Sequence, residues 1–309
     1  MDLNNLAGFL AATFRMATPI LLASLGGVFT ARVGIINFAL EGIMLVGAFM
    51  GVYGSYVTGN PWIGALMGSL GGLAVALILG YMSITVKADQ VVAGTGINIL
   101  SIGLTSYLLN VVFGIGAKPS AVAAFQEWAV PGLSNLPFVG PVLFRQIPLV
   151  YVALLLVPLT WYIIYKTPFG LSMRAIGEHP RAADSLGINV YRVRYLAVII
   201  SGILGGLGGA FLSIGQLSVF MEKLTSGRGY VAWSTVTVGK WNPLGIMGAS
   251  FLFGAADALQ LRLQTLGFKI PYQFFLMLPY ILTILVLAGV VGRTVPPASM
   301  GKPYGKEGR

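Results

Sequence analysis

The stretch WIGALMGSLGGLAVALILGYMSITV, residues 62–86, contains no Asp, Glu, Lys, Arg or His. About 20 apolar residues in a helix are enough to cross the roughly 30 Å of hydrocarbon in a bilayer. A helix of this composition has no polar face to present to water. We therefore predict that residues 62–86 span a membrane.

The composition of the whole chain agrees with a membrane protein. Apolar residues make up 56% of the 309 residues and charged residues 9%, and the mean hydropathy is +0.85. A soluble domain carries about a quarter charged residues, so this chain is too poor in charge to cover itself with a water-facing surface. The absence of cysteine and the single histidine, His179, exclude disulfides and multi-histidine metal sites. We expect no metal and no other cofactor.

The net charge of +10 would also fit a nucleic-acid-binding protein. The basic residues, however, are scattered through short loops between apolar runs and form no stripe along one face. This distribution is typical of positive charge retained on the cytoplasmic side of a membrane. We expect a lipid bilayer, and no nucleic acid, as the partner.

Eight stretches are long and apolar enough to span a bilayer. The first lacks the positive n-region of a cleaved signal peptide, so we expect it to be retained. A ninth segment, Gly229–Lys240, is too short for a regular span but apolar enough to enter the bilayer. The eight stretches are Gly8–Phe29, Ile35–Val57, Trp62–Val86, Val91–Gly114, Ile147–Tyr165, Leu196–Leu217, Leu244–Leu261 and Pro271–Val291.

The basic residues orient these stretches. The loop 166–195 and the tail 293–309 are both basic, which places both in the cytoplasm. An even number of crossings must then separate them, so residues 229–240 have to cross as well. This predicts an all-α fold of eight to nine transmembrane helices, some broken or re-entrant, with the N-terminus outside. The cytoplasmic basic residues are Arg32, Lys87, Lys166, Arg174, Arg181, Arg192, Arg194, Arg293, Lys302, Lys306 and Arg309.

We predict one membrane domain over residues 1–309. Residues 115–146 are rich in Pro and Gly and form an external loop, with a short surface helix at 121–128. Gly64, Gly68 and Gly72 recur every four residues, which predicts close helix packing. Other glycines interrupt the spans and suit broken helices that line a polar cavity.

Five polar residues within the spans are candidates for a solute path. A charge such as that of Glu41 costs on the order of 2.5–3.5 kcal/mol in the bilayer, so it must face protein or water. Asn37 would share its helical face at a spacing of four. Glu41 either makes a structural hydrogen bond to a neighbouring helix or lines the path. Asn98, Asp257 and Gln260 would add hydrogen-bonding side chains to the walls of this path, and among them only Asp257 is charged. A path with so little charge suits a neutral polar solute.

The central cytoplasmic loop contains its own short helix. Pro180 suits the first position of a helix and Gly187 its C-terminal stop. This predicts a helix at Pro180–Leu186 that presents Arg181 and Asp184 outward. The alternative is an amphipathic turn that lies on the membrane surface.

These motifs resemble a known family. Residues 26–42, GGVFTARVGIINFALEG, are similar to the second-span signature of ABC importer permeases of the branched-chain amino acid and simple sugar type. Residues 177–190 resemble the coupling loop of this family, which docks on the ATP-binding subunit. Residues 227–245 and 253–264 resemble its nucleoside-uptake branch. The coupling role is carried over to Gly177, Glu178, Pro180, Arg181, Ala182, Asp184 and Gly187.

The resemblance implies several partners in a bacterial cytoplasmic (inner) membrane. These are a second related permease, an ATP-binding subunit with two nucleotide sites and a lipid-anchored binding protein outside. It also implies a nucleoside solute such as guanosine or inosine. This sequence has Phe38-Ala39 where the nucleoside branch more often has Ile-Gly. The break before Glu41 is therefore bulkier here. The chain has no G-x-x-x-x-G-K-[ST] phosphate loop, so ATP hydrolysis would reside on a partner and the chain would not itself be an enzyme.

Three alternatives use the same residues differently. A permease of this family could carry simple sugars or amino acids. A stand-alone channel or proton-coupled carrier could use Glu41 and Asp257 as proton carriers. A membrane-embedded enzyme is disfavoured, because the sequence offers no Ser/His/Asp set, no Cys and no paired carboxylates within the membrane.

Overall fold

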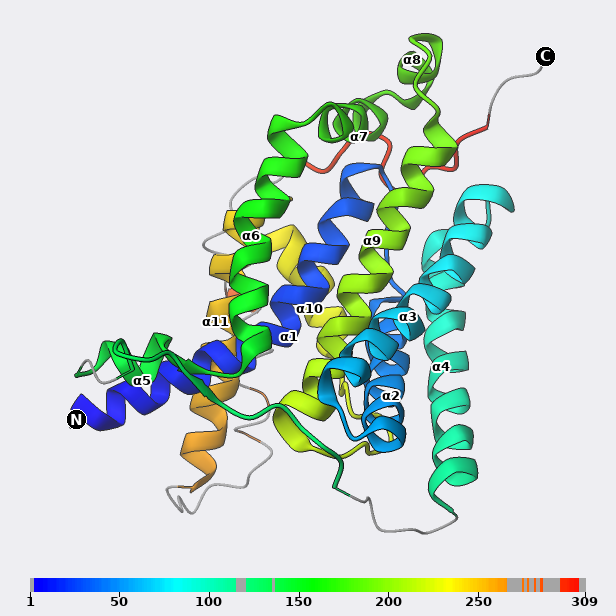
Figure 1. The fold of residues 1–309 in the computed structure, drawn as a ribbon. Helices are drawn as coiled ribbons and strands as arrows, with labels where there is room; N and C mark the ends of the chain where they lie inside the picture. Colours follow the sequence, from blue (N-terminus) through cyan, green and yellow to red (C-terminus); the bar gives the residue numbers. More distant parts are fainter. Residues whose placement is uncertain are drawn as a thin grey trace.

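The computed structural model describes residues 3–114, 121–134, 137–265 and 295–305, with isolated positions between 266 and 294. The described chain is a bundle of long helices (Figure 1). Its elements are α1 (Leu3–Arg32), α2 (Leu40–Thr58), α3 (Pro61–Gly80), the π-helical η1 (Tyr81–Thr85), α4 (Gln90–Phe113), β1 (Trp128–Ala129), α5 (Val139–Leu143), β2 (Arg145–Gln146), α6 (Pro148–Lys166), α7 (Pro168–Glu178), α8 (Pro180–Ser185), α9 (Val190–Ala210), the π-helical η2 (Phe211–Leu217), α10 (Arg228–Val238) and α11 (Pro243–Thr265).

Seven helices of the described chain are long and apolar enough to cross a membrane, and they correspond to the first seven predicted spans. The eighth predicted span, Pro271–Val291, lies outside the described residues. The seven are Asn5–Arg32, Leu40–Thr58, Pro61–Thr85, Gln90–Phe113, Pro148–Lys166, Val190–Leu217 and Pro243–Gln264.

Polar side chains fix where several of these helices begin. Asn60 accepts a hydrogen bond from the backbone of Trp62 at the start of α3, and Asn189 caps α9 in the same way. Asp89 accepts from two backbone amides at the start of α4. Such caps satisfy amides that have no partner within the helix, so a helix begins directly after each of them.

The central loop and the described tail lie at one end of the bundle (Figure 1). Ser299 N–H donates to the Gly177 carbonyl at 2.9 Å, and Gly301 N–H donates to the Gly34 carbonyl at 2.9 Å. We call this end the basic end. It carries Arg32, Lys87, Lys166, Arg174, Arg181, Arg192, Arg194, Lys240 and Lys302.

The short ninth segment crosses the bundle, as the sequence predicts. At the opposite end, the Ser218 carbonyl accepts a hydrogen bond from Val122 N–H in the external loop. At the basic end, the Trp241 carbonyl accepts from Arg32 at 2.7 and 3.0 Å. The chain between these points contains one helix, α10, whose 11 residues cover about 16 Å. This crossing is therefore half irregular and half helical.

Glycines bring α2, α3 and α9 into backbone contact, which confirms the close packing predicted from their spacing. A Cβ atom at Gly72 would lie 2.5 Å from the Gly202 carbonyl oxygen, and one at Gly209 would lie 1.9 Å from that of Met44. Since lipid provides no hydrophobic drive between helices, this close approach supplies their dispersion contacts.

The helix predicted at 121–128 is wrong. Residues 121–127 have no regular structure, and Trp128–Ala129 pairs antiparallel with Arg145–Gln146. The reason is that Val122 and Phe125 donate their backbone amides to Ser218 and Ile214, at the end of α9–η2. These donors are therefore unavailable to a local helix.

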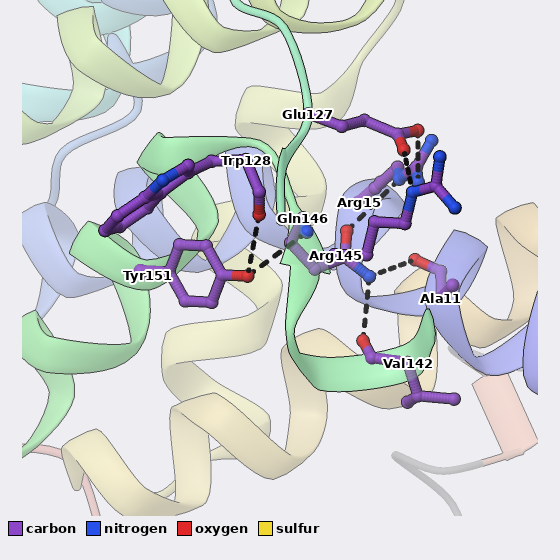
Figure 2. Close-up of polar contacts among 8 residues, drawn as sticks. All are labelled: Ala11, Arg15, Glu127, Trp128, Val142, Arg145, Gln146 and Tyr151. Carbon is purple, nitrogen blue, oxygen red and sulfur yellow. Dashed lines mark hydrogen bonds and ion pairs between the residues drawn. The ribbon is translucent and has the colours of Figure 1, made fainter. Parts of the chain in front are cut away.

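Figure 2 shows how Gln146 fixes the external loop on α1. Its buried side chain donates to the Val142 carbonyl at 2.8 Å and accepts from Arg15 Nε at 3.1 Å. Arg15 also forms an ion pair with Glu127 at 2.7 Å, so both strands of the hairpin are attached to the first helix.

Adding one methyl group tests the backbone contact. We expect Gly209→Ala to destabilise the protein by about 1–3 kcal/mol, because its Cβ would meet the Met44 backbone, which cannot rotate away. The measurement is the thermal unfolding midpoint in detergent. Gly103→Ala in α4 is the matched control, since no atom lies within 4 Å of its Cβ. Equal midpoints for the two variants would contradict the contact.

Candidate translocation site and coupling loop

The chain is unwound between α1 and α2. Residues 33–39 are mostly buried yet not helical, and Gly34 adopts a φ of +80°. Ile36 N–H donates to Gln90 Oε1 of α4 at 2.7 Å instead of bonding within a helix. Asn37 lies in this break, so the helix that would place Asn37 and Glu41 on one face is not formed.

Glu41 lies in the first turn of α2 and is almost completely buried. Its Oε1 accepts from Thr225 Oγ1 at 2.5 Å and from Gly227 N–H at 2.8 Å, and its Oε2 accepts from Gly229 N–H at 2.7 Å. The two amides belong to the start of α10, where the helix dipole favours a negative charge. The structure therefore shows the hydrogen bond to a neighbouring helix, which was one of the two interpretations of this residue.

Asn98 joins three elements at the same level of the bundle. Its Oδ1 accepts from Gly42 N–H of α2 at 2.8 Å. Its Nδ2 donates to the Phe38 carbonyl of the break at 2.9 Å and to the Tyr230 hydroxyl of α10 at 3.0 Å. One amide thus holds the break, α2 and α10 against α4.

Two amides beside the break keep unused hydrogen-bonding capacity. Asn37 is fully buried and donates to Ser201 Oγ at 2.9 Å, but its Oδ1 has no partner within the described chain. Gln90 is also buried, and its Nε2 likewise has none there. A buried amide atom without a partner costs free energy, so these atoms are ready to bind a polar group that enters.

Asp257 and Gln260 lie on α11, apart from the group formed by Asn37, Glu41 and Asn98. Asp257 is partly exposed and lies 3.8 Å from the guanidinium of Arg228, the first residue of α10. Gln260 is also partly exposed. The structure thus gathers three of the five predicted path residues around the break, and Asp257 contacts the first residue of α10.

The sequence analysis missed several members of this site. Thr225, Gly227, Gly229 and Tyr230 lie in or next to segments that were noticed for their apolar character or for the resemblance, and not as parts of a site. Gln90 was not noticed at all. Gly227 and Gly229 act through backbone amides, which no side-chain pattern reveals. The one available signal was the pair of glycines around Arg228, which lets α10 approach α2: a Cβ at Gly229 would lie 2.3 Å from Glu41 N.

The groups around the break are suited to binding a polar solute by hydrogen bonds. No group of three His, Cys, Asp or Glu side chains in the described residues could hold a metal ion. The Glu41 carboxylate is held by three donors, and a proton carrier would have to release them at each protonation. The remaining groups around the break are amides, hydroxyls and aromatic rings, together with the buried guanidinium of Arg194, which donates to the Val33 carbonyl.

The short helix predicted at Pro180–Leu186 is present at the basic end. α8 begins at Pro180 and ends at Ser185, and Gly187, with a φ of +85°, donates to the Asp184 carbonyl. Arg181 is exposed, as predicted. Ala182 is exposed as well, and Leu186 at the tip is 82% exposed. Asp184 was expected to point outward, but it is partly buried and forms a hydrogen bond with Tyr304 of the tail.

Glu178, the last residue of α7, contacts the tail. Its carboxylate accepts a hydrogen bond from Ala298 N–H of the tail at 3.4 Å. Gly177 packs against the end of α1, where a Cβ would lie 2.3 Å from the Arg32 carbonyl oxygen. The coupling loop therefore contacts both the tail and the start of the break.

A family model described as the branched-chain amino acid transport system permease component matches residues 9–287. The chain belongs to this permease family. The guanosine ABC transporter permease protein NupQ of Bacillus subtilis is 39% identical over 95% of both chains. The nucleoside ABC transporter permease protein NupC of Lactococcus lactis subsp. cremoris is 38% identical over 97% of this permease and 98% of its own length.

Another relative is named for a different solute. A candidate glucose ABC transporter permease protein of Haloferax volcanii, TsgC13, is 36% identical over 97% of this permease and 98% of its own length. Among solved structures, a candidate metal-chelate type ABC transporter in an inward-facing conformation is similar with a TM-score of 0.52. It is 15% identical and covers 91% of this permease and 85% of its own chain. The permease is thus a multi-pass membrane subunit with the ABC permease fold, and not an enzyme.

The bonds of Glu41 can be tested with an isosteric change. We expect Glu41→Gln to destabilise the permease by about 1–3 kcal/mol, because the amide presents N–H groups to the donors of α10. The readout is the thermal unfolding midpoint. Glu222→Gln, an exposed residue of the preceding loop, is the control and should leave the midpoint unchanged. If Glu41→Gln unfolds at the same temperature as this control, the bonds to α10 contribute no stability.

Proposed function

We propose that this permease carries nucleosides, such as guanosine or inosine, as one membrane subunit of an ATP-driven importer. The observation that carries the proposal is the match, over nearly the full length of both chains, to a permease named for guanosine. The candidate glucose relative is almost as similar, so identity alone does not separate the solutes. The chemistry around the break provides the further support.

The residues around the break suit a nucleobase. Asn37 Oδ1 and Gln90 Nε2 offer an acceptor and a donor without partners in the described chain. The rings of Phe38 and Tyr230 lie 6.1 Å apart beside them and could stack on a flat base. We infer that the solute passes along Asn37, Glu41 and Asn98, and that Asp257 and Gln260 line the path on α11. Glu41 shapes this path through α10 and does not carry protons.

The basic end suits docking of an ATP-binding subunit with two nucleotide sites. Leu186 is an apolar side chain exposed at the tip of an extramembrane helix, next to the exposed Arg181. We infer that Leu186 and Arg181 together contact the ATP-binding subunit. A second related permease and an extracytoplasmic binding protein complete the proposed importer in a bacterial cytoplasmic membrane, with the basic end inside.

The solute class is tested by ATP hydrolysis in the complete transporter reconstituted in liposomes. We expect guanosine or inosine, delivered by the binding protein, to stimulate hydrolysis severalfold, and glucose and branched-chain amino acids not to do so. Stimulation of ATP hydrolysis by glucose or an amino acid alone would indicate that the permease belongs to another branch of its family. Nucleoside uptake that needs no ATP and collapses with the proton gradient would support the stand-alone carrier.

Docking is tested at Leu186. Losing the burial of a leucine costs about 1.5–3 kcal/mol, so Leu186→Ser should weaken binding of the ATP-binding subunit at least tenfold. The measurement is the binding isotherm of that subunit on the permease in nanodiscs. Leu133→Ser, an exposed leucine of the external loop, is the matched control. Unchanged affinity in Leu186→Ser would exclude this tip from the interface.

A further inference from the structure

The tail residues 295–305 lie between the coupling loop and the unwound break. On the coupling-loop side, buried Ser299 donates from Oγ to the Gly177 carbonyl at 2.7 Å and to that of Ile176 at 3.0 Å. Its backbone N–H donates to Gly177 as well, at 2.9 Å. Ser299 is thus attached to the last turn of α7, directly before α8.

On the other side, the tail is attached to the first residues of the break. Gly301 N–H donates to the Gly34 carbonyl at 2.9 Å. A Cβ at Gly34 would lie 2.4 Å from Ser299 Oγ, and its φ of +80° also favours glycine. The tail and the break are therefore in direct backbone contact.

Tyr304 forms a second connection between the same two parts. Tyr304 is buried and its hydroxyl forms a hydrogen bond with Asp184 of α8. Burial together with this bond raises the pKa of Tyr304, so the phenol stays protonated and donates. The Arg194 guanidinium lies 5.9 Å from the centre of the Tyr304 ring. Arg194 is buried and donates from Nε to the Val33 carbonyl at 3.2 Å. Contacts thus lead from α8 through Tyr304 and Arg194 to the break.

The coupling helix itself is weakly packed. Ala183 is its one buried residue. A cavity of about 520 Å³ separates α8 from the tail, lined by Arg181, Ala182, Lys302 and Pro303 among others. Space on this side lets α8 shift, whereas Tyr304 and Ser299 hold the tail to both neighbours.

We propose that residues 297–304 act as a strap that transmits displacement of α8 to the break at 33–39, with Tyr304 and Ser299 as its positioning residues. This inference rests on the proposed function, because the displacement would come from the ATP-binding subunit. The break leads directly to Asn98 and to Glu41, so moving it changes the groups proposed to bind solute.

The first test measures amide hydrogen exchange in the purified permease, without partners or solute. In Tyr304→Ala we expect exchange at the Ile35 and Ile36 amides to rise at least tenfold, since the Arg194–Val33 contact loses its support. Tyr304→Phe keeps the ring over Arg194 and should give a smaller rise. Tyr107→Phe, at a two-thirds exposed tyrosine on α4, is the matched control. Faster exchange confined to 295–305, with 33–39 unchanged, overturns the strap.

The second test uses the complete transporter with ATP and guanosine. A transporter that carries Tyr304→Phe should assemble normally and hydrolyse ATP with an unchanged KM for ATP. It should nevertheless hydrolyse at least three times more ATP per guanosine imported. A parallel fall of hydrolysis and transport would indicate a merely structural role and overturn the inference. If the unmodified transporter does not import nucleosides, the proposed function fails, and the exchange measurement alone decides on the strap.

Discussion

The carboxylate of Glu41 at the start of α10 is the interaction on which the central architecture depends. A half-length helix cannot satisfy its first amides by itself when it begins inside the bundle. Glu41 supplies acceptors for Gly227 and Gly229, and the positive end of α10 in turn stabilises a buried charge. Each of these two features would be unfavourable alone. Together they allow the chain to cross on an irregular segment and one short helix.

The break at 33–39 follows from the same constraint. For Glu41 to reach α10, α2 has to begin within the protein, which leaves the preceding residues to be satisfied from other helices. Gln90 and Asn98 of α4 do so by bonding to Ile36, Phe38 and Gly42. Irregular backbone at membrane depth is tolerated when it is covered by protein in this way. The result is a polar region with almost no free charge, as a neutral solute requires.

Much of this fold could be predicted from the sequence, because its signals are local. Runs of apolar residues gave the seven described spans, Pro180 and Gly187 gave the coupling helix, and the distribution of basic residues required residues 229–240 to cross. The helix at 121–128 was wrong because its amides bond to the carbonyls of Ile214 in η2 and of Ser218 directly after it, far away in sequence. The helix that would place Asn37 and Glu41 on one face is not formed, because the break is imposed by α4 and α10. Backbone donors such as Gly227 have no residue-type signature, and the pairing of Asp257 with Arg228 depends on how two helices meet.

The glycine contacts among α2, α3 and α9 also limit which parts of the permease can move. Backbones that touch at Gly72–Gly202 and at Met44–Gly209 have no side chains between them that could change rotamer and allow sliding. These three helices therefore behave as one rigid body during a transport cycle. Relative movement is then expected along a different seam, and α4 is the neighbour with the smallest buried share among the described spans. Since Asn98 lies on α4, the groups that hold the break also lie on the boundary where the rigid body and its surroundings separate.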